Sequence, residues 1–530
     1  MTIAIDFGTS NTVISRWNQT TKQPEIVKLP DISIISVENP PLIPSLIYVE
    51  NIAEKKVVIG QQVRNKGYDV NTESRFFRNF KRGIGANIQG FLPELDGQVV
   101  SFEKVGELFL KDVIAGISKV PLPVESLIFT VPVDSFEAYR NWLGEVCQSL
   151  EVEQVRMIDE PTAAALGYGM ADAEILLVVD FGGGTLDLSL VKLDNSMGKQ
   201  PLGFILKWGE KSFGKSSNQK VKTARVLAKA GHNLGGSDID NWLVDYFVKS
   251  QGIERSPLIT RLAEKLKIQL SLQQQGTEVF FDDESLESYE LELSRDGFEE
   301  ILRENGFFTS LDESMSRVLQ QAKRQGMELS EIDAVLLVGG TVQIPAVQRW
   351  VREYFDAGKV RCEKPFEAIS QGALQLIQGV EVKDFLYHSY GIRYWDRKKN
   401  SHSWHPLIRS GQPYPMSSSI ELILGASMNS QPSIELVLGE LGAESGGTEV
   451  YFDGDRLITR KISGEQTVVQ LLNDREGGRS IAQLNPLGNP GRDRIKVLFW
   501  VDESRFLRIT VEDLLTNEIL LNEQAVVQLS

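Results

Sequence analysis

The chain has 530 residues, of which 42% are hydrophobic and 24% are charged. This composition is typical of a globular protein, and the length allows several domains with sizeable cores. The net charge of −16, from 72 acidic and 56 basic residues, argues against general binding to nucleic acid or to anionic membranes.

The amino-terminal residues and the cysteines indicate the compartment. Met1–Asp6 carry no basic region and begin a strand at once, so we expect no secretory signal, and no stretch approaches the roughly 20 apolar residues of a membrane span. Cys147 and Cys362 lie in apparent helix or strand, so we interpret them as small buried hydrophobes rather than a disulfide. We therefore expect a cytoplasmic protein.

Two short stretches, Ile5–Ser10 and Val179–Thr185, echo each other. Each follows an apolar run and leads into an alternating run, which predicts strand, tight turn and strand, used twice. Turns rich in Gly, Thr and Ser let backbone N–H groups approach a phosphate without Cβ clashes. Asp6 and Asp180, at the strand ends, suit a hydrated Mg²⁺. The pair predicts a nucleotide clamp built from a duplicated half.

Two charged residues are candidates for catalytic roles near the phosphates. Glu160 begins the small-residue stretch Glu160–Leu166 and could order a water; the alternative is a helix-start carboxylate favoured by the dipole. Lys81 could neutralise charge that develops on a phosphoryl group, although a lone lysine is more often simply solvated.

Up to about residue 379 buried strands alternate with amphipathic helices, which indicates an α/β architecture. The expected strands and helices are Ser126–Val131, Ile175–Val179 and Ala334–Val338, and Ser135–Leu150, Leu258–Gln273 and Ile344–Phe355. Two glycines, Gly339 and Gly340, follow the last of these strands, and Pro345 stands near the start of the next helix. Flat glycine surface there suits a purine or ribose; the alternative is a turn that serves packing alone.

Three patterns invite assignments that we do not favour. Gly209–Ser216 matches G-x-x-x-x-G-K-S, but the preceding run Phe204–Trp208 is short and the following residues are polar and basic rather than an apolar helix. Lys199–Arg225 is a basic stretch that we interpret as a solvated insertion, with an anion-binding or partner-docking loop as the alternative. His402 and His405 have no Cys or acidic residues with metal-ligand spacing.

From about residue 390 to residue 530 the pattern changes to short alternating runs separated by Gly, Asn, Pro and Asp. Runs at Ser419–Leu424, Ser433–Leu438, Arg494–Val501 and Phe506–Val511 predict an all-β sandwich or barrel. We therefore expect an α/β domain over 1–379, a linker over 380–389 and a β domain over 390–530.

These motifs resemble the seventy-kilodalton heat-shock chaperones of DnaK type, in the actin–hexokinase superfamily. Asp6–Asn11 and Asp180–Asp187 look like the two phosphate loops of the family, Ile158–Gly169 like its connecting motif and Val338–Pro345 like its adenosine motif. Gly235–Asp240 also matches, and the similarity spans nearly the whole chain. The resemblance implies a two-lobed, actin-like ATPase domain followed by a peptide-binding β-sandwich.

The resemblance also implies roles for individual residues. The hydrolytic group would be Lys81, Glu160, Asp180, Thr185 and Asp187, with Asp6 and Asp180 near Mg²⁺ and K⁺. Contacts to ATP or ADP would come from a larger set: Gly8, Thr9, Ser10, Asn11, Gly182, Gly183, Gly184, Gly235, Gly236, Glu264, Lys267, Ser271, Gly339, Gly340 and Gln343.

The chain departs from the family pattern at several places. Phe366 stands where the family usually has an acid near the nucleotide. The linker, normally an acid followed by leucines, is reduced to Lys383–His388, and we expect no helical lid after the sandwich.

Our leading hypothesis is an ATP-hydrolysing chaperone that acts in protein folding and the stress response. Its implied partners are unfolded or extended polypeptides, a J-domain co-chaperone and a nucleotide exchange factor, with no nucleic acid or membrane. The alternative is a nucleotide-dependent scaffold that docks one protein partner. A sugar or small-molecule kinase of the same superfamily is disfavoured by the Glu160–Leu166 match and the appended β domain.

Overall fold

The structure is a computed structural model. It describes residues 1–70, 73–86, 88–118, 124–132, 136–148, 150, 152, 154–170, 175–194, 204–208, 223–282, 287–324, 326–375, 384–386, 389–396, 401–409, 412–416, 418–441, 448–453, 456–461, 469–473, 480–502 and 505–529. The chain divides into two compact units: unit 1 is Met1–Val382 with Glu449–Arg460, and unit 2 is Lys383–Thr448 with Lys461–Ser530. Among the helices in these ranges, none is both long and apolar enough to cross a membrane.

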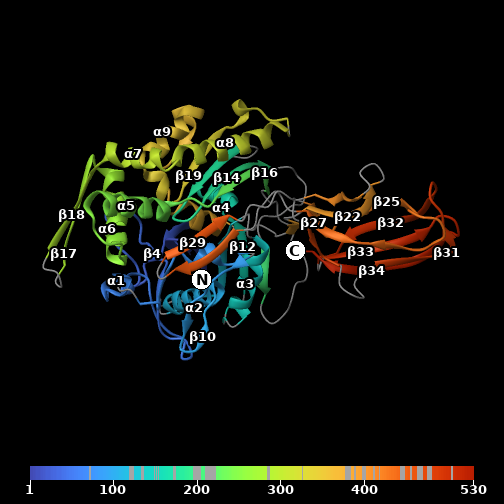
Figure 1. Cartoon of the computed structure of the whole chain (residues 1–530), viewed down its shortest axis with the longest axis horizontal. Helices are drawn as coiled ribbons and strands as arrows, with labels where there is room; N and C mark the ends of the chain where they lie inside the picture. Colours follow the sequence, from blue (N-terminus) through green and yellow to red (C-terminus); the bar gives the residue numbers. More distant parts are fainter. Residues whose placement is uncertain are drawn as a thin grey trace. The chain divides into compact units, whose positions relative to one another are not determined.

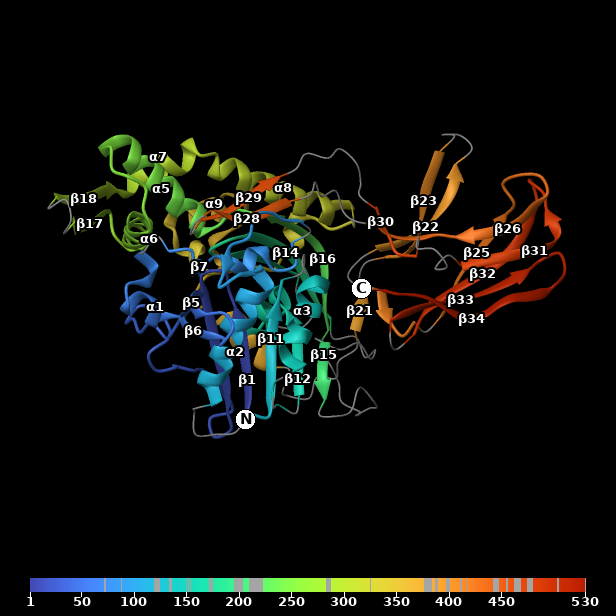
Figure 2. The same ribbon diagram turned by 60° about the horizontal axis from the view of Figure 1, so that its bottom comes forward.

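Two sheets form the centre of unit 1 (Figures 1 and 2). The first has the order β15-β12-β11-β1-β2-β3, with β4 on β2, and the second has the order β16-β14-β13-β19-β20. Their strands are β1 (Thr2–Phe7), β2 (Asn11–Asn18), β3 (Gln23–Ile26), β4 (Ile43–Pro44), β11 (Ser126–Val131), β12 (Gln154–Asp159), β13 (Ile175–Phe181), β14 (Leu186–Asp194), β15 (Phe204–Trp208), β16 (Thr223–His232), β19 (Ala334–Val338) and β20 (Val360–Arg361).

The two sheets repeat one arrangement. In each, an antiparallel hairpin (β1 with β2, β13 with β14) pairs through its first strand with a parallel strand (β11 or β19). Every residue of β19 is buried, as expected for a parallel strand covered on both faces. The strand–turn–strand unit that the sequence predicted twice is therefore confirmed at both places.

Two short helices rich in small residues pack between the sheets. Helix α4 (Glu160–Gly167) begins with Asp159 as N-cap, whose carboxylate accepts a hydrogen bond from Thr162 N at 2.8 Å. A Cβ built on Gly372 of α10 (Ala368–Ala373) would lie 1.8 Å from Ala163 O, so only glycine allows this approach. The alanines of α4 pack with residues of both sheets in one core. This packing holds Glu160, the first residue of α4, at the junction of the two halves.

The remaining elements of unit 1 build the outer parts of the two halves. The helices are α1 (Gln61–Asn65), α2 (Phe102–Ser118), α3 (Phe136–Gln148), α5 (Gly236–Gln251), α6 (Pro257–Leu272), α7 (Arg295–Glu304), α8 (Phe307–Arg324) and α9 (Pro345–Tyr354), with 3-10 turns η1 (Tyr68–Val70), η2 (Phe80–Gly83), η3 (Leu329–Glu331), η4 (Gly340–Gln343) and η5 (Ala357–Lys359). The strands are β5 (Leu46–Asn51), β6 (Lys56–Ile59), β7 (Phe76–Arg78), β8 (Ile88–Gln89), β9 (Glu94–Leu95), β10 (Gln98–Val99), β17 (Gln275–Asp282) and β18 (Glu287–Ser294). The three helices predicted from periodicity correspond to α3, α6 and α9.

Unit 2 is built from strands. Its sheets have the orders β23-β22-β27-β30, β25-β32-β33-β34, β26-β31 and β21-β24, and one core contains side chains from all four. The strands are β21 (Asp384–Leu386), β22 (Ser389–Asp396), β23 (Ser401–Ile408), β24 (Gln412–Tyr414), β25 (Ile420–Gly425), β26 (Gln431–Leu436), β27 (Leu438–Leu441), β30 (Val469–Leu471), β31 (Ser480–Gly488), β32 (Asp493–Val501), β33 (Phe506–Asp513) and β34 (Glu518–Gln528). The predicted fold class, an α/β domain followed by a β-sandwich, is confirmed.

One hairpin of the C-terminal region belongs to unit 1. Strands β28 (Thr448–Asp453) and β29 (Arg456–Lys461) form a sheet with β8. The sequence led us to expect one continuous β domain over 390–530, and its alternating pattern gives no sign that this hairpin pairs elsewhere. Pairing partners are a tertiary property that a local pattern does not contain.

Candidate functional site

A cavity of about 430 Å³ lies in unit 1 where the two halves meet. Both hairpin turns, α6 and the Gly339–Gln343 segment line it. It collects most of the residues that the sequence singled out: Asp6, Gly8, Thr9, Ser10, Asn11, Lys81, Glu160, Asp180, Gly182, Gly183, Thr185, Gly236, Glu264, Lys267, Ser271, Gly339, Gly340 and Gln343. Gly184, Gly235 and Asp187 do not line this cavity.

The two hairpin turns have the same geometry and touch each other. Gly8 N donates to Asn11 O at 3.1 Å, and Gly182 N donates to Thr185 O at 3.1 Å. A Cβ on Gly183 would lie 1.8 Å from Ser10 Oγ, so the turns can approach only because this residue is glycine. The result is a concave surface of backbone and hydroxyl groups, which suits a polyphosphate.

Gly184 and Gly235 support this surface without lining the cavity. A Cβ on Gly235 would lie 2.4 Å from Gly184 N, so the start of α5 packs directly on the second turn. Gly236 N and Ser237 N donate to the carbonyls of Gly182 and Gly183, at 3.1 and 2.8 Å. Gly184 and Gly235 therefore allow the start of α5 to support the backbone of the second turn, and neither of them lines the cavity.

Buried carboxylates converge at the end of the cavity beside the turns. Burial, and then the charge of Glu160, raise the pKa of Asp6 to about 6, although Lys81 and a 2.7 Å hydrogen bond from Thr130 Oγ1 act in the opposite direction. Burial, then Glu160 and Asp187, raise the pKa of Asp180 well above its ordinary value. Negative charge is thus in excess at this end.

Lys81 supplies a cation to this carboxylate cluster. Its Nζ donates to Glu160 Oε1 at 2.9 Å, and the side chains of the pair are 12% and 10% exposed. Burial acts to lower the pKa of Lys81, but Glu160, Tyr139 and Asp6 together raise it above its ordinary value and keep the ammonium charged. Lys81 also lies 5.8 Å from the ring centres of Phe7 and Tyr139. The Lys81–Glu160 pair is therefore held in a nearly dry setting.

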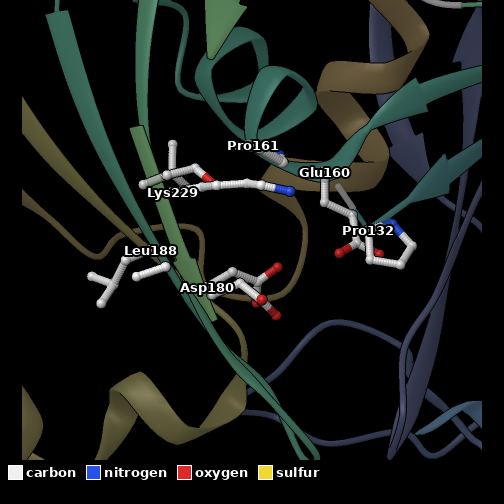
Figure 3. A pocket seen from close by; sticks show the side chains of 10 residues that line it. Pro132, Glu160, Pro161, Asp180, Leu188 and Lys229 are labelled. Carbon is white, nitrogen blue, oxygen red and sulfur yellow. The ribbon is translucent and has the colours of Figure 1, made fainter. Parts of the chain in front are cut away.

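A small pocket opens beside Glu160, and Figure 3 shows it from close by. Glu160, Asp180 and Asp187 line it with Pro132 from the end of β11. The side chain of Lys229, on β16, extends across it toward α4 (Figure 3). The sequence did not point to Lys229, because its position opposite Ser189 in the β14–β16 register depends on tertiary pairing.

The carboxylates fit a Mg²⁺ ion. Among the described residues no group of three or more His, Cys, Asp or Glu side chains has a metal-holding arrangement. Mg²⁺ commonly takes only one or two carboxylates and completes its shell with waters and phosphate oxygens. Burial, and then neighbouring carboxylates, raise the pKa values of Asp6 and Asp180, and a divalent cation bound beside them would stabilise their charged forms.

Two ion pairs lie at the other end of the cavity. Arg64 of α1 donates to Glu264 of α6 at 2.7 Å, and Lys267 Nζ lies 2.7 Å from Asp240 Oδ1. Although burial acts to raise it, Arg64 and Lys267 lower the pKa of Glu264 to about 2. Ser271 Oγ donates to the carbonyl of Lys267 at 3.0 Å, so its oxygen remains an acceptor toward the cavity.

Glycines and an aromatic ring complete this end. Gly339 has a φ of 87°, in the region that favours glycine, and a Cβ there would lie 2.4 Å from Phe181 O. A Cβ on Gly340 would lie 3.1 Å from the ring of Phe366, which also lines the cavity. This flat, apolar wall suits the stacking of a planar ring.

Two arginines of the segment around Lys81 lie at or beside the site, and no motif in the sequence pointed to them. Arg82 packs against Gly184 and lies 3.3 Å from Asp238 Oδ1, with its side chain 5% exposed. Arg78 lines the cavity, and its buried Nε has no hydrogen-bond partner among the described residues. The candidate P-loop Gly209–Ser216 lies outside the described residues.

Comparison with known proteins agrees with this geometry. A family model described as Hsp70 protein matches residues 2–199 and 222–394. Chaperone protein dnaK1 of Synechocystis sp. is 28% identical to this chain over 413 residues, which are 74% of this chain and 51% of that protein. The chain thus spans about half the length of this relative. Because the family match extends over more than half of its residues, the chain belongs to the Hsp70 family.

Proposed function

We propose that unit 1 binds Mg-ATP and hydrolyses it to ADP and phosphate. The observation that carries this proposal is the meeting of two glycine turns with the Lys81–Glu160 pair and the carboxylates Asp6 and Asp180 in one cavity. Family membership supports an ATP-dependent activity in general.

The position of each residue in the cavity indicates which part of Mg-ATP it would contact. The turns at Gly8–Asn11 and Gly182–Thr185 would hold the phosphates through backbone N–H and hydroxyl donors. Asp6 and Asp180 would hold Mg²⁺ through its waters, and the ion supplies positive charge to the phosphate oxygens when bound. Glu264, Lys267 and Ser271 would face the base and ribose opposite Gly339, Gly340 and Gln343.

Hydrolysis would require an ordered water and a fixed cation. Glu160, Asp180 and Asp187 would orient the water and accept its proton, since these three carboxylates line the small pocket beside the turns, and the hydroxyl of Thr185 would help to orient the water. The ammonium of Lys81 would stabilise charge on the transferred phosphoryl group, because a preorganised cation in a dry site stabilises the transition state without reorganisation.

We further propose that unit 2 binds unfolded or extended polypeptide, with affinity set by the nucleotide state of unit 1. Such coupling requires that the two nucleotide states make different contacts with the rest of the chain. A J-domain co-chaperone, a nucleotide exchange factor, K⁺ at the site, a role in stress and a cytoplasmic location belong to this proposal as expectations from the family.

The decisive experiment measures the steady-state ATPase rate with and without an unfolded peptide. The proposal predicts Mg²⁺-dependent hydrolysis that the peptide stimulates. Hydrolysis without stimulation would separate the ATPase from peptide binding, and the absence of any hydrolysis would contradict the ATPase.

The alternative function is a nucleotide-dependent scaffold for one protein partner. It is favoured by two exposed aromatic side chains on β22, Tyr394 at 40% and Trp395 at 44% exposure. Exposed aromatic side chains are enriched in protein interfaces. A pull-down with and without ATP distinguishes the two functions: a chaperone retains many unfolded clients, whereas a scaffold retains one partner in fixed ratio.

A further inference from the structure

The hairpin formed by β28 and β29 completes unit 1 from a distant part of the sequence. Figure 2 shows it, in the orange of the C-terminal region, near β7. Strand β28 runs parallel to β8, with Val450 opposite Gln89, and Gly90 N donates to Val450 O at 2.9 Å. The approach is close, because a Cβ on Gly90 would lie 3.0 Å from Cβ of Tyr451.

Phe452 anchors this hairpin. Its ring stacks on Phe102 at 4.4 Å and meets the edge of Phe77 at 5.3 Å between ring centres. Phe452 is only 8% exposed, and Val450 is 2% exposed. Aromatic pairs of this kind stabilise a fold beyond the area that they bury. The hairpin is therefore packed into unit 1 and does not lie loosely on its surface.

The two rings that Phe452 touches flank the segment that carries Lys81. Phe77 lies in β7, just before this segment, and the ring of Phe102 covers Gly83 at its end: a Cβ on Gly83 would lie 2.3 Å from that ring. Between them Asn79 turns the backbone with a φ of 58°. The path of this backbone therefore depends on the two phenylalanines and on what packs behind them.

The contact between Lys81 and Glu160 constrains the position of the Lys81 backbone closely. Its Nζ must reach Glu160 at 2.9 Å from a buried backbone between fixed rings. A displacement of about 1 Å at a reacting group can slow catalysis about 100-fold, even when the change that causes it lies elsewhere.

We propose that Phe452 is a positioning residue for Lys81, and that the hairpin 449–460 clamps the segment from Phe77 to Gly83 in its hydrolytic conformation. The proposal rests on the ATPase function proposed above. It makes hydrolysis in unit 1 dependent on chain that lies C-terminal to residue 448, whether or not peptide is bound to unit 2.

The test compares single-turnover hydrolysis by full-length variants. We expect Phe452→Ala to slow hydrolysis of bound ATP about 10-fold while the Kd for ATP changes by less than about twofold, and Phe452→Leu to recover part of the rate. Phe298→Ala is the matched control, because it removes a fully buried ring from α7 of the same unit. It should leave the hydrolysis rate of bound ATP unchanged. In the Lys81→Ala background, Phe452→Ala should have no further effect, because both changes act through the same ammonium.

A second readout does not depend on activity. Hydrogen exchange of residues 76–86 in nucleotide-free protein should accelerate in Phe452→Ala and in Gly90→Val, which forces β28 away without removing a ring. Unchanged exchange there, or an equal slowing of hydrolysis with and without Lys81, would overturn the proposal. If the wild-type chain hydrolyses no ATP, the ATPase proposal fails, and the exchange experiment still decides whether the clamp exists.

Discussion

Each unit contains buried ionisable groups, and the two sets are arranged in opposite ways. In unit 2 Arg494 and Asp513 form a two-pronged pair, at 3.0 and 2.7 Å, with side chains 7% and 1% exposed. Although burial acts to raise it, Arg494 lowers the pKa of Asp513. In unit 1 burial and neighbouring carboxylates raise the pKa values of Asp6 and Asp180.

The difference separates a structural pair from a binding site. The oxygens of Asp513 also accept hydrogen bonds from backbone N–H groups, at 2.9 Å from Leu515 N, so this charge is compensated within the fold. The negative charges of the carboxylates around Lys81 are compensated only in part, and this lack of compensation lowers the stability of the folded state. Such imbalance in a cavity is typical of sites that are completed by a ligand or ion.

The largest expected effect comes from breaking the compensated pair. Arg494→Met should lower the free energy of unfolding of unit 2 by about 3–5 kcal/mol, because it leaves the Asp513 charge buried without its partner. Denaturation followed by hydrogen exchange in β32 and β33 measures the loss. The double variant Arg494→Met/Asp513→Leu is the control and should lose much less, since no unpaired charge remains. A single variant within about 1 kcal/mol of wild type would contradict this account.

The next effect concerns chemistry in unit 1. Lys81→Ala should slow single-turnover hydrolysis about 100-fold or more while ATP binding stays largely intact, because the ammonium acts on charge that develops during the reaction. Rapid-quench measurement of the bound nucleotide reports the rate. Unchanged hydrolysis would remove Lys81 from the mechanism.

Acid should affect the two units in opposite directions. The folded-state pKa of Asp6 is raised to about 6 from 3.8, so its contribution to stability in nucleotide-free protein falls, by at most about 3 kcal/mol, as pH rises through this window. The pKa of Asp513 is lowered, so its contribution is present above the unfolded-state pKa and is lost as pH falls through the folded-state pKa. In Mg²⁺-free buffer, hydrogen exchange should show unit 1 losing stability as pH rises from 4 to 6, whereas unit 2 should lose stability only as pH falls below about 4, the unfolded-state pKa of an aspartate. Asp6→Asn, which keeps an acceptor for Thr130, should flatten the slope of unit 1.

The smallest effect is expected at the far end of the cavity. Arg64→Ala should weaken ATP binding about fivefold and leave the hydrolysis rate of bound ATP unchanged, because the Arg64–Glu264 pair lies away from the carboxylate cluster and contributes to binding alone. Calorimetric titration with ATP measures the change. A fall in the rate with normal affinity would show that this pair acts on the chemistry instead.

Most of the site could be predicted because its residues sit in local patterns. Asp6 and Asp180 stand at the ends of apolar strands, and glycines follow them, so the turns were visible from strand periodicity and turn chemistry alone. Arg64, Arg82 and Lys229 were missed for a physical reason. Each reaches the site only because elements distant in sequence pair or pack there, and an exposed arginine or lysine has the same local pattern.

By itself the sequence determined that the chain holds an α/β domain with a duplicated glycine turn and a β domain, since strand, helix and turn preferences act over a few residues. Only the tertiary structure decided that the hairpin at 449–460 pairs with β8 and that Phe452 packs behind the Lys81 segment. An edge strand carries unpaired backbone groups that any other strand can satisfy, so its partner is selected by packing and not by its own sequence pattern.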